Sequence, residues 1–146
     1  MNTPARGLSR NVIHPVVLAL GAALLLAGCG TTKDAKSRDD IASLKTTHLA
    51  FIDEFTEGAG KTWDDQKLAS RTAAVELQFT NAEQYEATKK KDARRSAAIS
   101  NLHSQFKRNV KSLESGKAFY RPTFAAHLKD QVGQNYDQAL RGEDLR

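Results

Sequence analysis

The feature that most constrains the fold is a long stretch, residues 61–115, that contains neither Gly nor Pro. Gly and Pro are the residues that most often end a helix, so their absence favours helix throughout this stretch. One straight helix of that length would be a rod of ~80 Å, too long for a compact domain of this size. We therefore expect a break, either at Thr80-Asn81 or in the charged run Lys89-Lys90-Lys91-Asp92, and we favour a turn at residues 89–93.

Apolar side chains recur at steps of three and four residues in four segments, which places them on one face of a helix. Within the second segment, residues 75–80 alternate as a strand would, but their helical neighbours and the lack of a partner strand favour helix. The residues expected to form the core are Ile41, Leu44, His48, Phe51, Ile52 and Phe55; Leu68, Thr72, Val75, Phe79 and Ala82; Ile99, Leu102, Phe106, Val110 and Leu113; and Phe124, Leu128, Val132, Tyr136 and Leu140.

Each expected helix has residues suited to its ends. Asp39-Asp40 favours the start of the first helix, and Gly58-Ala59-Gly60 favours its end. Thr62 is the expected N-cap of the second helix, with Asp65 as its capping-box partner. Gly116 is placed to end the third helix. Pro122 is tolerated in the first turn of the fourth helix, which is expected to end at Gly142.

Four amphipathic helices with short connections predict an all-α fold. We expect a small up-down bundle of three to four helices over residues 39–142. The same apolar stripes would also fit three long helices or an antiparallel dimer of helical hairpins. The sequence therefore leaves the oligomeric state open.

The first 29 residues have a different character. Arg6 and Arg10 precede an apolar stretch, residues 16–28, whose helix would span ~20 Å, short of the ~30 Å hydrocarbon core of a bilayer. Such a stretch is typical of the apolar part of a signal peptide. It ends in Leu26-Ala27-Gly28-Cys29, an aliphatic residue, two small residues and a Cys. This pattern resembles the lipobox of bacterial lipoprotein precursors.

The resemblance covers the leader alone. It implies that residues 1–28 are a cleaved signal peptide and that the sulfur of Cys29 is lipidated, which leaves no free thiol because Cys29 is the one Cys of the chain. Two or three acyl chains hold a protein durably in a bilayer. Residues 29–38 would then be the lipidated Cys and a flexible tether, since residues 30–38 contain no large apolar side chain.

The residue after the Cys carries a further implication for location. Gram-negative lipoproteins that stay in the inner membrane commonly have Asp there, and this chain has Gly30. The resemblance therefore implies a place in the outer membrane, facing the periplasm, if the source is Gram-negative.

Other motifs favour a protein without catalytic function. Gly58-Ala59-Gly60-Lys61-Thr62 matches the end of a phosphate-binding loop, but Phe55 stands where the pattern requires its first Gly. His48, His103 and His127 lack the close spacing of paired metal ligands. Adjacent carboxylates fit helix starts better than a catalytic pair, and the sequence has no nucleophile elbow. We expect no catalytic residue, no metal and no cofactor.

Basic side chains concentrate in residues 89–111, which hold eight Lys and Arg against one Asp, a net charge of +7. Such a run is most often a solvated helix face. It is also a candidate surface for an anionic partner, to which we expect these residues to contribute: Lys90, Arg94, Lys107, Arg108 and Lys111. Nucleic acid is a poor partner for an exported, anchored protein. We expect another envelope protein, an anionic lipid or lipopolysaccharide instead.

Together these features predict a lipid-anchored lipoprotein of the cell envelope whose helical domain binds or scaffolds another envelope component. One alternative is an exclusion or immunity-type lipoprotein that acts against the entry of phage, plasmid or toxin. A third class, an enzyme, would require a pocket with converging polar groups, such as a cluster of His48, His103 and His127. None of these interpretations specifies the partner or the pathway.

Overall fold

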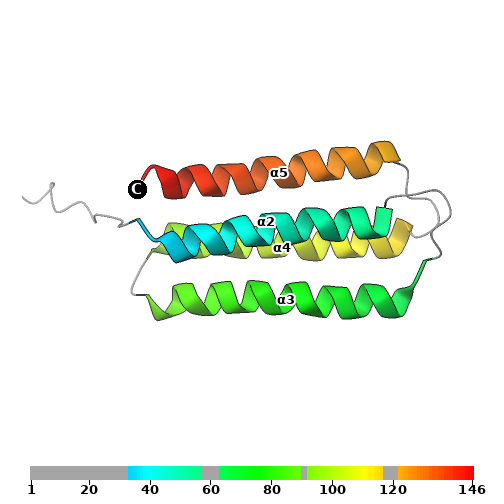
Figure 1. Ribbon diagram of the computed structural model, residues 1–146, viewed down its shortest axis with the longest axis horizontal. Helices are drawn as coiled ribbons and strands as arrows, with labels where there is room; N and C mark the ends of the chain where they lie inside the picture. The colour runs from blue at the N-terminus through cyan, green and yellow to red at the C-terminus, as the bar shows by residue number, and fades with distance from the viewer. Residues whose placement is uncertain (1–32, 57–62, 90–91, 117–121) are drawn as a thin grey trace, which may run out of the picture. The chain divides into compact units, whose positions relative to one another are not determined.

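The computed structural model describes residues 33–56, 63–89, 92–116 and 122–146. These residues form four helices: α2 (Ala35–Thr56), α3 (Asp65–Thr88), α4 (Ala93–Gly116) and α5 (Pro122–Asp144). Within the described ranges there is no strand. Successive helices run in opposite directions (Figure 1), so the all-α up-down bundle expected from the sequence is confirmed, with four helices.

The helices do not pack equally on one another. α2 lies between α3 and α5 and packs on both, and α3 packs on α4. The contact between α4 and α5 is the least extensive of the four between neighbouring helices. The bundle is therefore closed on three sides and more open along the side where α4 faces α5.

Most of the expected core residues are buried. All five expected residues of α4 are among them, as are those of α2 as far as Ile52, while Phe55 is partly buried. In α5, Phe124 is half exposed and Ala125 is buried in its place. The reason is spacing: Ala125 stands seven residues, close to two full turns, before the fully buried Val132, so it lies within about 20° of the inward face, whereas Phe124 is rotated from that face by about 80°.

The start of α2 corrects the expected tether. The first helix begins at Ala35, four residues before the expected start at Asp39. Residues 35–38, the last four of the expected tether (residues 29–38), are therefore helical. The Asp34 side chain accepts a hydrogen bond from the backbone N–H of Ser37 (3.1 Å), as an N-cap does. Ser37 itself is fully buried and donates its hydroxyl to Glu86 of α3. A tether was expected because this segment has no large apolar side chain. The packing of Ser37 was missed because that packing is through polar contacts.

The turn expected at residues 89–93 is confirmed, since α3 ends at Thr88 and α4 begins at Ala93. Asp92 accepts a hydrogen bond from the backbone N–H of Arg95 at the start of α4 (3.0 Å). The N-cap expected at Thr62 is wrong, because Asp64 caps α3 through the backbone N–H of Lys67 (2.9 Å). The end expected at Gly142 is also wrong: α5 continues to Asp144.

Several expectations concern residues outside the described ranges. These include the signal peptide and lipobox (Leu26, Ala27, Gly28 and Cys29), the Gly-rich turn at residues 58–60, and Lys90. Of the helices that are described, none is long and apolar enough to cross a membrane.

A cluster of rings fills the middle of the bundle. Phe106 of α4 lies at its centre, with its ring centroid 5.0 Å from that of Phe51 and 5.1 Å from that of His48. His48 is fully buried: its Nδ1 lies 3.3 Å from the hydroxyl of Tyr136, and its Nε2 lies 3.0 Å from the side-chain nitrogen of Asn109. A neutral ring with its proton on Nδ1 satisfies both contacts. The histidine of the first apolar stripe is therefore part of the core.

Burial lowers the pKa of His48 from its ordinary value of 6.5 to about 4. The unfolded chain thus binds a proton between pH 6.5 and 4 that the folded chain excludes, so stability falls as the pH falls through this window. We predict a loss of about 3 kcal/mol from this group by pH 4. Urea unfolding of the full chain at several pH values measures this loss. The His48→Gln variant should show a correspondingly weaker dependence on pH.

The matched control is His127→Gln, because His127 is exposed on α5. This variant should follow the pH dependence of the unchanged protein. Equal slopes for the His48 variant and the unchanged protein between pH 6.5 and 4 would contradict the assignment.

Candidate functional site

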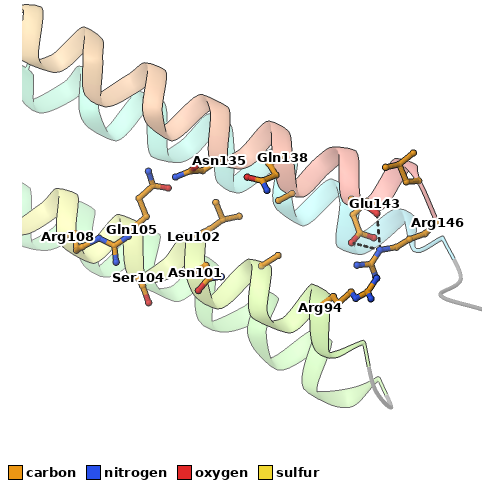
Figure 2. A pocket seen from close by; sticks show the side chains of 14 residues that line it. Arg94, Asn101, Leu102, Ser104, Gln105, Arg108, Asn135, Gln138, Glu143 and Arg146 are labelled. Carbon is orange, nitrogen blue, oxygen red and sulfur yellow. Dashed lines mark hydrogen bonds and ion pairs between the residues drawn. The ribbon is translucent and has the colours of Figure 1, made fainter. Parts of the chain in front are cut away.

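The open side of the bundle contains a groove between α4 and α5 with a cavity volume of about 680 Å³ (Figure 2). It follows α4 from Arg94 to Arg108 and α5 from Asn135 to the end of the chain. Leu102 and Ala139 contribute apolar surface. A volume of this size falls within the range of sites that bind small molecules.

Four side-chain amides are among the polar groups that line the groove. Asn101 and Gln105 project from α4, and Asn135 and Gln138 project from α5. Each amide offers both a donor and an acceptor. The groove can therefore match a ligand that presents both kinds of group, as a peptide backbone does.

Gln105 has an unusual position within this lining. Its residue exposure is 5%, and in Figure 2 its side chain leaves α4 and points toward α5, on the side where Asn135 projects. Its Oε1 is buried and has no hydrogen-bond partner within the described part of the chain. Leaving such an acceptor unpaired costs about 1–3 kcal/mol, so this side chain is kept polar at the expense of stability.

Two of the expected basic residues lie in the groove. Arg94 and Arg108 are exposed, line it, and form no ion pair with any residue that the structure describes. They are 14 positions apart on α4, which separates their Cα atoms by ~21 Å along the helix. The part of the groove wall that α4 forms therefore has, at each of its two ends, a positive charge that is unpaired among the described residues.

The other expected basic residues do not join them. Lys107 points toward α3, where its Nζ lies 3.7 Å from Glu76 Oε2. Lys111 is exposed and does not line the groove, and Lys90 lies outside the described residues. One residue along a helix rotates a side chain by about 100°, so Lys107 and Arg108 face different neighbours. The basic run is thus divided between faces instead of forming one surface.

A buried ion pair joins α4 to α5 at one end of the groove. Arg95 and Glu143 are 4% and 5% exposed, and their side chains form hydrogen bonds of 2.6–3.0 Å. The hydrogen bond to Glu143 is the main cause of a raised Arg95 pKa. Glu86 of α3 lies 3.9 Å from the same guanidinium. Because Ser37 of α2 donates to Glu86, this network connects all four helices.

Further charges surround this network, and their side chains are largely buried. Lys89 forms an ion pair with Asp34 and lies over the ring of Tyr85, with its Nζ 3.6 Å from the ring centroid. Desolvation, followed by the charge of Arg95, lowers the pKa of Lys89. Arg146 pairs with Asp92, so the end of the chain is held against the start of α4. Polar contacts therefore connect the helices at this end of the groove.

The three histidines considered as metal ligands occupy separate places. His48 is in the core, and His127 is exposed on α5. His103 stacks on Phe79 with a centroid distance of 4.6 Å, and its ring nitrogens lie 2.6 Å from Glu76 and 3.0 Å from Glu83. Within the ranges that the structure describes, no group of three or more His, Cys, Asp or Glu is arranged to hold a metal ion.

Sequence reasoning missed the amides of the groove and the Arg95–Glu143 pair. Asn and Gln scattered through helices give no motif, and the separation of α4 from α5 does not follow from either helix alone. One signal was available: Arg94, Asn101, Gln105 and Arg108 stand at helical steps of seven, four and three, which places four polar side chains on one face.

Comparison with known proteins gives no relative of this chain. No family model matches it, and neither a curated protein nor a solved structure matches it. The function must therefore be argued from the chain's own residues.

We predict that Glu143→Gln lowers the free energy of unfolding by about 3 kcal/mol, because it leaves the buried Arg95 without its main partner. Urea unfolding of the full chain measures the change. The matched control is Asp144→Asn, one residue along, since Asp144 is exposed and pairs with the exposed Arg38. That variant should leave stability almost unchanged. Equal losses in the two variants would show that the buried pair has no special part in the fold.

Proposed function

We propose that this protein is a lipid-anchored lipoprotein of the bacterial cell envelope whose helical bundle is a non-catalytic binding domain. The observation that carries the proposal is Leu26-Ala27-Gly28-Cys29 at the end of a short apolar stretch with Arg6 and Arg10 before it. In this interpretation residues 1–28 are removed, and lipid on Cys29 holds the mature chain in the membrane.

The early start of α2 supports a particular arrangement of the anchored protein. The described chain begins at Lys33, four residues after Cys29, and four extended residues reach at most ~14 Å. An anchor at Cys29 would therefore keep the start of α2 close to the bilayer. The end of α3, the start of α4 and the C-terminus lie at this same end of the bundle (Figure 1). The groove would begin near the membrane and run away from it.

The groove supports a binding function for the domain. It combines unpaired cations, side-chain amides and a buried acceptor without a partner within the described ranges. A bundle that served only as a spacer would need none of these groups. We propose another envelope component as the partner. Gly30 after the Cys favours the periplasmic face of the outer membrane in a Gram-negative host.

Intact-mass measurement of the protein purified from bacterial membranes tests the anchor. We predict a chain that begins at Cys29 and carries the added mass of a diacylglycerol and one further acyl group. The Cys29→Ser variant should lack this mass and leave the membrane fraction, because no sulfur is present to receive lipid.

Gly30→Ala is the matched control, since it changes the neighbouring residue and keeps the four lipobox residues. It should be lipidated and remain with the membrane. An unmodified thiol at Cys29, with residues 1–28 still attached, would overturn the proposed anchor.

A further inference from the structure

The groove between α4 and α5 is lined by polar groups, some of which have no hydrogen-bond or ion-pair partner among the described residues. Gln105 is nine-tenths or more buried, points into the groove, and has an acceptor oxygen without a partner within the described residues. Arg94 and Arg108 line the same groove and pair with no carboxylate that the structure describes. The Gln105 amide and the two arginines are separate observations. Among the described residues the amide oxygen lacks a hydrogen-bond donor and the arginines lack an anion, and a ligand could supply both.

The spacing of the charges limits what the ligand can be. Along α4 the two arginines are ~21 Å apart, a distance spanned by about six residues of extended chain. Guanidinium groups bind carboxylates with two parallel hydrogen bonds. A chain with two acidic side chains about six residues apart would therefore place one carboxylate at each arginine.

The amides of the groove favour an extended backbone over a helical one. A helix pairs its own N–H and C=O groups, so it would leave Asn101, Gln105, Asn135 and Gln138 unmatched. An extended chain presents an N–H and a C=O at every residue, and the Oε1 of Gln105, which is buried in the structure, can accept from one of these N–H groups once its side chain turns outward. None of the described residues that line the groove is aromatic, so a sugar ring or a nucleic-acid base has no platform for stacking.

We propose that the α4–α5 groove binds an acidic peptide segment in extended conformation. Arg94 and Arg108 hold its carboxylates, and Gln105 accepts from its backbone. This inference rests on the proposed function, in that it specifies the partner of the anchored domain as the exposed acidic segment of another envelope protein.

Fluorescence anisotropy with a labelled synthetic peptide tests the proposal on the full chain in detergent micelles. The probe has two Glu residues about six positions apart, separated by Ser, Asn and Ala. We expect saturable binding that weakens as salt is added, because the contacts at the two arginines are ionic. The same peptide with Lys in place of both Glu should not bind.

Three variants separate the groove from a general charge effect. Arg108→Glu should weaken peptide binding by at least about tenfold, whereas Lys111→Glu, one turn further along α4 and outside the groove, should change it by less than about twofold. Gln105→Leu should weaken binding by about fivefold without lowering the urea midpoint, because it removes an acceptor that the folded chain leaves unpaired. A merely structural role for Gln105 would move stability and binding together.

Several results would overturn the proposal. They are no binding of the acidic probe, equal losses in the Arg108 and Lys111 variants, and tighter binding of an acidic oligosaccharide than of the peptide. The outcome is separate from that of the anchor. A correctly lipidated chain that does not bind the probe would contradict the proposed peptide site alone. An unlipidated chain that binds the probe would contradict the proposed lipid anchor alone.

Discussion

The buried pair of Arg95 and Glu143 is the interaction on which the shape of the open side depends. α4 and α5 contact each other less than any other neighbouring helices, so their separation is not set by a continuous apolar seam. It is set at one end by this ion pair and by the end of the chain, which Arg146 attaches to Asp92. Replacing a whole buried pair by apolar residues often costs little stability, whereas removing one partner leaves an uncompensated buried charge and is strongly destabilising. The groove lies where α4 and α5 are joined by charges at one end and are less closely packed along the rest.

The same helix serves the core and the groove through its periodicity. Phe106 of α4 points into the core, while Asn101 and Gln105 face the gap beside α5, and the buried Leu102 contributes to both. A shift of one position along α4 would turn the Gln105 amide toward the core and Phe106 toward the groove. Core packing around Phe106 therefore also fixes the direction of Gln105. This coupling explains how a residue can stay buried and polar without a partner in the described chain: the apolar neighbours that stabilise α4 hold it there.

Much of the fold follows from the sequence, and little of the site does. The apolar stripes at steps of three and four predicted the four helices and nearly all of the core, because burial of one face determines which residues point inward. The turn after Thr88 followed from a charged run without apolar side chains. The packing of Ser37 on Glu86 did not, since a polar contact between residues 49 positions apart has no periodic signal. The groove could not be predicted for a related reason. It depends on the distance between α4 and α5, and the basic residues of α4 give no information about that distance.

Gln105 gives the strongest physical argument that this distance matters. In a bundle of this size one or two kcal/mol is a large share of total stability, and a leucine at position 105 would pack beside Leu102 without an unpaired acceptor. The folded chain instead keeps an amide whose oxygen finds no partner within the described residues. Asn135 projects from α5 on the side to which Gln105 points, but the Gln105 Oε1 forms no hydrogen bond with it. The gap between the two helices and the unpaired acceptor therefore lie at the same place, where a ligand that fills the gap meets both.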